Sequence, residues 1–343
     1  MTLSIRRCAA FASLSAVLVT LPCAASSAAE YFDGKRIAVT VGLPAGGGFD
    51  LYARLLAHHW TRHIPGNPNV IVLNSPGAGS VKAANYVYSV AAKDGTQLAM
   101  TLDVTPLFQL FDVSGVKYDV AKMGWIGNMT SLTGHMVVWH TAPATTMDEV
   151  RKKEIIVGTT GGKQGQAYIY AAMMKAFTGA KFRIIGGYGG SSSLDPAMER
   201  GEIQGRSVSW NSYMISKPSW IAQKKVIPLV QIGLKKDPNL PNVPMVAEFA
   251  TSEEGRKVLE LMSTTSAFSR AVWGPPGIPK EALDILRKSF DATMDDPALR
   301  ADGAKRKFHL DPMTGAEVEA QARKLQTAAA STVRAAKAAL EAK

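Results

Sequence analysis

The alternation of short apolar runs with longer segments of helical spacing constrains the fold of this chain more than any other feature. Ile37–Val41, Val70–Leu73 and Gln97–Thr101 read as strands, and the segments Phe49–His63 and Ser80–Ala91 between them carry apolar residues three and four positions apart. Strands that alternate with helices form parallel sheets with helices on their faces. The sequence therefore predicts an α/β lobe built as β-α-β-α-β.

The same alternation restarts in the second half of the chain, after a β-rich passage from Trp125 to Trp139. The elements predicted there are, in order, strand Ile155–Val157, helix Gln166–Phe177, strand Phe182–Ile185, helix Ser193–Glu199 and strand Gln204–Val208. A chain of 343 residues is long enough for two such units. We therefore expect two lobes, each a mainly parallel sheet flanked by helices.

A cluster of prolines marks the predicted return from the second lobe. Pro238, Pro241 and Pro244 follow the predicted strand Val226–Ile232, and such a composition is typical of a connection. The elements predicted beyond it are a helix at Glu253–Met262, a strand at Ala267–Trp273, a helix from Lys280 to Met294 and an alanine-rich terminal helix. The terminal helix has one apolar face, so we expect it to pack on a lobe.

The first residues have the pattern of an export signal. Arg6-Arg7 precede an apolar run from Ala9 to Leu21, and Ser27-Ala28-Ala29 supplies small residues for cleavage. The run is shorter than the roughly 20 residues of a membrane-spanning helix. We expect residues 1–29 to be a signal peptide that is removed after Ala29.

Cysteine and charge content narrow the function classes. Both cysteines, Cys8 and Cys23, lie in the predicted leader, so no thiol remains for a disulfide, a metal or catalysis. Pro22 stands where a lipid-attachment motif has a small residue, which argues against lipidation of Cys23. The net charge is +11, or +9 without Arg6-Arg7. Export argues against nucleic acid, which leaves a solvated basic surface or an anionic small ligand.

The sharpest local motif is Leu43–Asp50, with the sequence LPAGGGFD, which joins a predicted strand to a predicted helix. Glycines let the backbone approach a ligand closely, and the first turn of a helix favours an anion. Asp50 would repel an anion beside it and also suits a helix start. Anion binding and a structural turn both remain open for this motif.

Two further glycine-rich segments occupy equivalent positions. Gly158–Gly165 resembles a nucleotide-binding P-loop, but Val157 stands where that motif needs glycine and Gln164 where it needs Ser or Thr. Its hydroxyls, backbone donors and Lys163 suit an anionic group, and Lys163 equally suits a solvated loop. In Gly186–Ser193, Tyr188 either lines a cleft or fills the core. Trp210, just past a strand end, is a candidate ligand contact, although tryptophans more often pack in cores. Three such loops fit the rule that ligands bind at the carboxyl ends of parallel strands.

The sequence gives little indication of a catalytic site. His59 and His63 are four residues apart on a predicted helix, but no third metal ligand is indicated, so we interpret them as surface histidines. There is no Gly-x-Ser-x-Gly nucleophile motif. The sequence therefore predicts no enzyme, no cofactor and no metal.

Several motifs together resemble one family. They are Pro44–Asp50, Asn74–Ser80 with the sequence NSPGAGS, Lys93–Thr96, Gly187–Gly190, Gly201–Ile203, and Leu240–Pro244 followed by Glu248. In order and spacing they resemble the Bug-type substrate-binding proteins of tripartite tricarboxylate transporters. The resemblance covers nearly the whole chain beyond the leader.

The resemblance implies a two-lobed, type II-like periplasmic binding protein fold with a ligand cleft between the lobes. Lobe 1 would be discontinuous, at 30–134 and 240–343, and lobe 2 would span 135–239. The protein would reside in the periplasm, capture a small organic acid and deliver it to membrane permease subunits. A sensing role, or an enzyme acting on an anionic substrate, are the competing interpretations.

The resemblance also implies ligand-binding positions in the glycine loops. Combined with the candidates above, the predicted ligand-binding residues are Ala45, Gly46, Gly47, Phe49, Asp50, Thr159, Thr160, Gly161, Lys163, Gly165, Tyr188, Gly189 and Trp210. Phe49 and Lys163 depart from the smaller residues usual in the family, which favours a larger or partly apolar acid, a mono- or dicarboxylate and possibly an aromatic one. Whether Phe49 faces the ligand or the core remains open.

Overall fold

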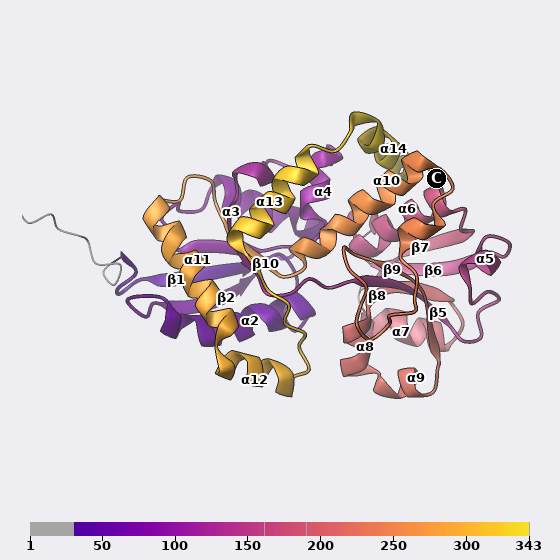
Figure 1. Ribbon diagram of the computed structural model, residues 1–343, viewed down its shortest axis with the longest axis horizontal. Coiled ribbons are helices and arrows are strands. Elements are labelled where there is room, and N and C mark those ends of the chain that lie inside the picture. Colours follow the sequence, from indigo (N-terminus) through magenta and orange to yellow (C-terminus); the bar gives the residue numbers. More distant parts are fainter. Residues whose placement is uncertain (1–30, 161, 190, 343) are drawn as a thin grey trace, which may run out of the picture.

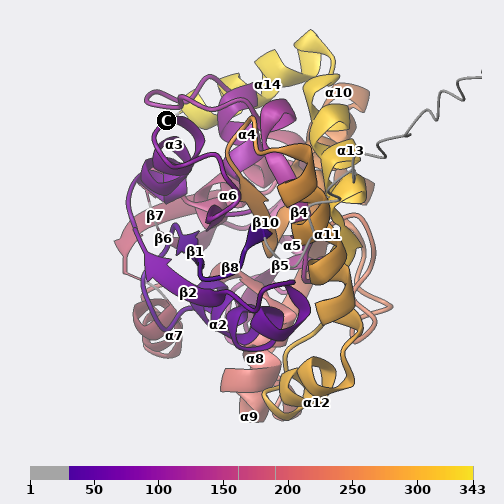
Figure 2. The same cartoon turned by 90° about the vertical axis from the view of Figure 1, so that its left-hand side faces the viewer.

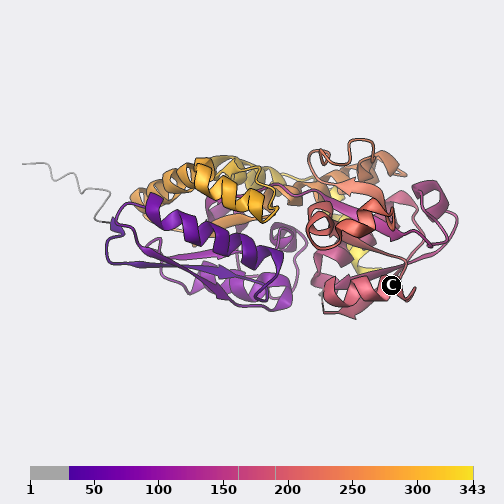
Figure 3. The same ribbon diagram turned by 90° about the horizontal axis from the view of Figure 1, so that it is seen from below.

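Two α/β lobes lie side by side along the long axis of the molecule (Figure 1), and the view from below shows the same separation (Figure 3). This computed structural model describes residues 31–160, 162–189 and 191–342. The predicted signal peptide lies outside the described residues. Among those residues, no helix is both long and apolar enough to cross a membrane.

The first lobe is built on a sheet of six described strands. Their order is β11 (Met313–Thr314), β4 (Gly124–Asn128), β10 (Ala271–Gly274), β3 (Gln97–Met100), β1 (Arg36–Val41) and β2 (Asn69–Asn74). The helices of this lobe are α2 (Gly48–Trp60), α3 (Val81–Ser89), α4 (Thr105–Leu110), α11 (Lys280–Asp295), α12 (Pro297–Lys305) and α13 (Gly315–Gln326). Helices α2 and α11 pack together on one face of the sheet, and α3 lies on the other (Figure 2).

The second lobe has a sheet of five described strands. Their order is β7 (Phe182–Tyr188), β6 (Ile155–Thr160), β8 (Gly205–Ser209), β5 (Gly134–Trp139) and β9 (Val226–Ile232). Its helices include α5 (Met147–Val150), α6 (Gln166–Thr178), α7 (Ser191–Glu199), α8 (Trp210–Ser216) and α9 (Pro218–Ala222). The described part of both lobes also contains the short 3₁₀ turns η1 (Thr61–His63), η2 (Ala78–Ser80), η3 (Val120–Lys122), η4 (Gly162–Gln164), η5 (Val246–Phe249) and η6 (Thr264–Phe268).

Buried apolar stripes explain why these segments form these elements. Five of the six residues of β1 are buried, and four of its side chains are β-branched, which suits a strand covered on both faces. In α2, Tyr52, Leu55, Leu56 and Trp60 recur at helical spacing and are buried against the sheet. The α/β class and most element positions are therefore confirmed.

Each sheet is parallel in one part and antiparallel in the other, whereas the sequence pattern predicted mainly parallel sheets. Strand β1 pairs in parallel with β2 and β3, but β10 runs antiparallel to β3. In the second sheet, β5 runs antiparallel to β8 and β9. Strands β5 and β10 each enter their sheet from the other lobe, so their amino ends lie at the edge where the parallel strands end. Their direction is reversed for that reason.

The return to the first lobe lies later in the chain than the prolines suggested. The side-chain amide of Gln231, on β9, donates through Nε2 to the backbone carbonyls of Leu240 and Val243 at 2.8 Å each. The proline-rich loop therefore folds back on the second lobe. Helix α10 (Glu253–Ser263) then packs on α6. The chain returns only through η6 into β10. Residues 240–263 therefore lie against the second lobe, although the prediction gave them to the first.

The alanine-rich terminal segment forms two helices instead of one. Helix α13 packs on β4, whereas α14 (Ala330–Glu341) packs on α6 and α10 of the second lobe (Figure 1). The chain leaves helical geometry between Thr327 and Ala329. The terminal segment therefore spans both lobes.

Candidate functional site

A cleft of about 400 Å³ lies between the lobes, where the parallel strands end. From the first lobe it is lined by the loops that follow β1, β2 and β3, which contribute 42–44, 76–80 and 102–103. From the second lobe, its lining includes residues after β6 and the end of β8. This position follows the general rule for ligand sites in open α/β sheets. A larger hollow of about 910 Å³ adjoins it and shares Leu132, Thr133 and Ser209.

The predicted ligand-binding residues divide into two groups. Phe49, Thr160, Gly165 and Gly189 line the cleft. The residues that do not line it are Ala45, Gly46, Gly47, Asp50, Thr159, Lys163, Tyr188 and Trp210. Gly161 lies outside the described residues.

Of the predicted second-lobe residues that do not line the cleft, three pack inside that lobe and one is exposed. Thr159 is fully buried in β6, and Trp210 is buried in a hydrophobic cluster of the second lobe, where its backbone amide donates to His135 Nδ1 at 3.2 Å. Tyr188 packs partly buried against the same cluster. Lys163 is exposed in η4.

Asp50 stabilises the first glycine loop. Its buried carboxylate accepts hydrogen bonds from the Gly46 amide at 2.9 Å, Arg54 Nε at 2.9 Å and Asn74 Nδ2 at 3.0 Å. Burial opposes ionisation of the carboxyl, but these three donors outweigh that effect and lower its pKa. Of the two roles left open for this motif, the contacts of Asp50 favour the structural turn.

The loop after β2 supplies a larger part of the cleft than the first glycine loop. Ala78, Gly79 and Ser80 adopt left-handed φ angles of 46°, 59° and 76° in succession. The buried Ser80 hydroxyl donates to the Gly42 carbonyl at 3.1 Å and accepts from the Leu102 amide at 3.2 Å. It thereby joins three strand-end loops. A glycine-rich strand-to-helix connection was visible here in the sequence, but these residues were not among the predicted site residues.

Arg270 brings a guanidinium to the cleft and was not among the predicted site residues. It precedes β10 and lies over the ring of Phe49, with 3.9 Å from Cζ to the ring centroid, and 5.0 Å from that of Tyr52. One Nη donates to the Ser269 carbonyl, and Nε is buried with no partner among the described residues. A Cβ at Gly48 would lie 2.9 Å from the other Nη, so this glycine leaves room for the guanidinium.

Among the described residues, no acidic side chain forms a salt bridge with Arg270. Burial lowers its pKa, which Tyr52 and Asp103 partly oppose, but an arginine stays protonated at neutral pH. The cleft therefore carries a guanidinium without a carboxylate partner from the described chain. No local sequence pattern marks Arg270, because it reaches the site on the strand that returns from the other lobe.

Asp103 and Gln166 connect the lobes across the cleft. Gln166 Nε2, at the start of α6, donates to Asp103 Oδ2 and lies 3.2 Å from the hydroxyl of Tyr170. Asp103 is 4% exposed, and its Oδ1 has no partner among the described residues. Burial raises the pKa of this carboxyl to about 7, although the charge of Arg270 opposes the shift.

A second guanidinium in the cleft has a carboxylate partner. Arg206 Nη1 donates to Asp195 Oδ1 at 2.6 Å, and each side chain is 7% exposed. The hydroxyl of Tyr213 also donates to Asp195, at 3.3 Å. The charge of Arg206 is therefore balanced inside the second lobe.

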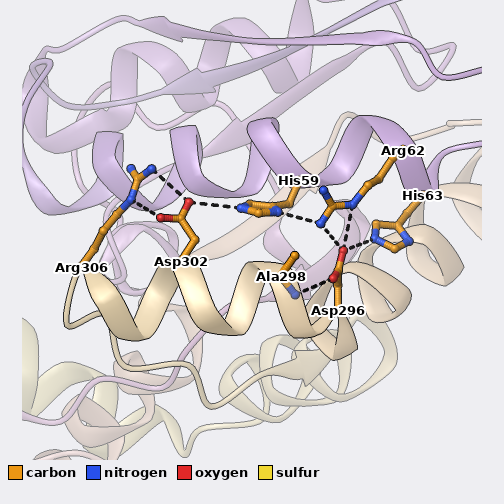
Figure 4. A network of polar contacts seen from close by, with 7 residues as sticks. All are labelled: His59, Arg62, His63, Asp296, Ala298, Asp302 and Arg306. Atoms are coloured by element: carbon orange, nitrogen blue, oxygen red, sulfur yellow. Dashed lines mark hydrogen bonds and ion pairs between the residues drawn. The ribbon is translucent and has the colours of Figure 1, made fainter.

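His59 and His63 belong to an ionic network between α2, η1 and α12 (Figure 4). His59 is buried, and its Nε2 lies 3.2 Å from Asp302 Oδ2. His63 Nε2 lies 2.8 Å from Asp296 Oδ2, which also accepts from Arg62. The expectation of two surface histidines is thus wrong for His59, which is covered by α12.

Replacing Asp296 tests this network. Hydrogen bonds from His63, Arg62 and the Ala298 amide hold the pKa of its carboxyl well below the usual range. A carboxyl whose pKa is lower in the folded than in the unfolded protein stabilises the fold at pH values above its unfolded-state pKa, near 3.9. This stabilisation is lost as the pH falls through its folded-state pKa. We expect Asp296→Asn, which keeps a helix-capping side chain, to lower the free energy of unfolding by about 1 kcal/mol at pH 7.

Urea unfolding at pH 7, 5 and 3 measures this difference. The difference in unfolding free energy between wild type and Asp296→Asn should be the same at pH 5 as at pH 7 and smaller at pH 3. Asp284→Asn removes an exposed pair with Lys280 and serves as the control. A difference that is absent at pH 7, or that grows at pH 3, would contradict the prediction.

Comparison with known proteins places the chain in a family. The model of the tripartite tricarboxylate transporter family receptor matches residues 53–339. The chain belongs to this family. It is also 28% identical over 313 residues to the UPF0065 protein in gbd 5'region of Cupriavidus necator, covering 89% of this chain and 88% of that protein. The resemblance stated from the sequence motifs is therefore confirmed.

Two solved structures show the same fold as this tripartite tricarboxylate receptor chain. MatC from Rhodopseudomonas palustris with bound malate has a TM-score of 0.63 at 17% identity, covering 90% of this chain and all of that one. A second R. palustris protein, with adipate, has a TM-score of 0.62 at 16% identity, covering 87% of this chain and 97% of that one. The two-lobed binding-protein fold is thereby confirmed for this family member.

Proposed function

We propose that this receptor captures a small organic carboxylate in the interlobe cleft and delivers it to a membrane permease of the tripartite tricarboxylate type. The observation that carries the proposal is the guanidinium of Arg270, which lies in the cleft without an acidic partner among the described residues. Arginine binds carboxylates through parallel charge-assisted hydrogen bonds. Bound malate and adipate in the two R. palustris neighbours support the same class of ligand.

The contacts between the lobes support capture by closure. Gln166 bonds to Asp103 across the cleft, and a Cβ at Gly79 would lie only 2.7 Å from the carbonyl of Gln164. Asn211 Nδ2 donates to the Lys307 carbonyl at 3.2 Å, again between lobes. A ligand held between these surfaces would favour the closed arrangement, because it binds both lobes at once.

The proposed location is the periplasm, with residues 1–29 removed on export. The N-terminal sequence pattern supports this, as does membership of a transporter receptor family. The intact mass of the exported protein tests it. A chain that begins near Glu30 is expected, and one that retains Arg6 and Arg7 would contradict the proposal.

Calorimetry and thermal shift with a panel of mono- and dicarboxylates test the capture of acids. An acid at a hundred times its dissociation constant is expected to add about 2.7 kcal/mol to the free energy of unfolding. Binding by no acid in the panel would contradict the proposed function. Conversion of a bound acid to product would favour the enzyme, and co-purification with a sensor instead of a permease would favour the sensing role.

A further inference from the structure

The described lining of the cleft contains two guanidinium groups and one carboxyl group. Of the described lining residues, Arg206 and Arg270 are basic and Asp103 is acidic. Arg206 is paired with Asp195 at 2.6 Å inside the second lobe. Arg270 has no salt-bridge partner among the described residues, so it offers one positive charge to a ligand. A single carboxylate satisfies that charge.

Asp103 opposes a second carboxylate in the same cleft. It is 4% exposed and belongs to the lining, and the bond from Gln166 occupies only one of its oxygens. Two carboxyl groups that share a confined site repel each other when both are ionised. Because burial raises the pKa of Asp103 to about 7, this repulsion grows as pH rises through neutrality. The charged and titratable groups around Asp103 are Arg270 beside β10 and Tyr170 on α6.

Much of the remaining lining is apolar. It includes Leu43, Pro44, Pro76, Ala78, Leu102, Leu132, Ala167, Leu194 and Val208. Removing an ionised group from water into such surroundings is unfavourable unless a charge or several donors meet it. Hydroxyls such as those of Thr160 and Ser209 also line the cleft, but among the described lining residues Arg270 is the one cation that no salt bridge pairs with a carboxylate. A hydrocarbon chain or ring would gain from burial against the apolar side chains.

Phe49 holds the Arg270 guanidinium in place. The guanidinium lies 3.9 Å from the ring centroid of Phe49, and Gly48 leaves the space beside it. Phe49 itself is partly buried against the core of the first lobe. Stacking on an aromatic face fixes the plane of the guanidinium, and a fixed plane favours two parallel bonds to one carboxylate.

We propose that the cleft selects a monocarboxylate with an apolar chain or ring over the dicarboxylate of the same skeleton, and that Phe49 is a positioning residue for Arg270. This inference rests on the proposed function, since it specifies which carboxylates the cleft accepts. It also separates this chain from the two neighbours with malate and adipate, which are dicarboxylates.

Titration calorimetry on matched pairs tests the selection. The pairs are butanoate with succinate, hexanoate with adipate, and benzoate with terephthalate, at pH 6 and pH 8. We expect the monocarboxylate of the best-binding pair to bind at least tenfold more tightly, with a larger ratio at pH 8. A dicarboxylate that binds as tightly as its partner would overturn the inference and leave the proposed function intact, whereas no binding in any pair or in the wider panel contradicts the proposed function itself.

Two variants test the assigned residues. Asp103→Asn removes the acidic charge, so it should reduce the mono- over dicarboxylate ratio and its pH dependence; an unchanged ratio would overturn the role of Asp103. Phe49→Leu keeps apolar volume but removes the ring, so it should weaken monocarboxylate binding about tenfold. Phe49→Tyr keeps the ring and should restore affinity. Equal affinity for Phe49→Leu and wild type, with both folded by circular dichroism, would overturn the role of Phe49.

Discussion

An Asp195→Ala variant is expected to be about 3–5 kcal/mol less stable than the wild-type protein. Asp195 and Arg206 form an ion pair at 2.6 Å in which each side chain is only 7% exposed. Removing one partner of a buried pair leaves the other charge in a poorly solvated site, which accounts for losses of this size. The hydroxyl of Tyr213 loses its acceptor in the same variant.

Urea unfolding measures this loss, and two further variants identify its cause. Asp284→Ala removes an exposed pair with Lys280 and should change stability by less than about 1 kcal/mol. The double variant Asp195→Leu/Arg206→Met replaces the pair with apolar groups and should recover much of the stability, because no buried charge remains. If Asp195→Ala lowers stability no more than Asp284→Ala does, the predicted cost of leaving Arg206 buried without its partner is wrong.

An Arg270→Gln variant is expected to bind its carboxylate about 10- to 150-fold more weakly. The expectation follows from the value of hydrogen bonds to charged groups, about 1.5–3 kcal/mol. Arg270→Lys keeps the charge but loses the planar guanidinium that stacks on Phe49, so its affinity for the carboxylate should lie between those of Arg270→Gln and wild type. Titration calorimetry on the three proteins measures their dissociation constants and so ranks their affinities.

The stability of the ligand-free variant separates binding from a structural role. Arg270 has no salt-bridge partner among the described residues and its Nε lacks a hydrogen bond, so Arg270→Gln should cost the free protein no more than about 1 kcal/mol. Arg300→Gln, on the exposed surface of α12, is the matched control for affinity. Unchanged affinity in Arg270→Gln would remove this guanidinium from the site.

The sequence by itself determined the class of fold, the leader pattern and the edge of the sheets at which the cleft lies. Apolar periodicity is local, so it identifies strands such as β1 and helices such as α2 without knowledge of their partners. Glycine-rich segments after predicted strands indicated the cleft edge, because parallel strands end together. Four predicted residues, Phe49, Thr160, Gly165 and Gly189, line the cleft for that reason.

Only the tertiary structure decided which side chains meet in the cleft. Arg270, Asp103, Gln166 and Arg206 come from four separate segments, and nothing within any one segment distinguishes them from ordinary surface or core positions. Asp50 is a predicted site residue for which the tertiary structure gives another role. Its place in a glycine loop suggested a ligand contact, but its carboxylate accepts three hydrogen bonds that stabilise the loop. Whether a charge is balanced by a neighbour or left for a ligand depends on long-range packing. Local sequence patterns therefore indicated the edge where the cleft lies, and the crossing of the chain between the lobes determined which charged side chains line it.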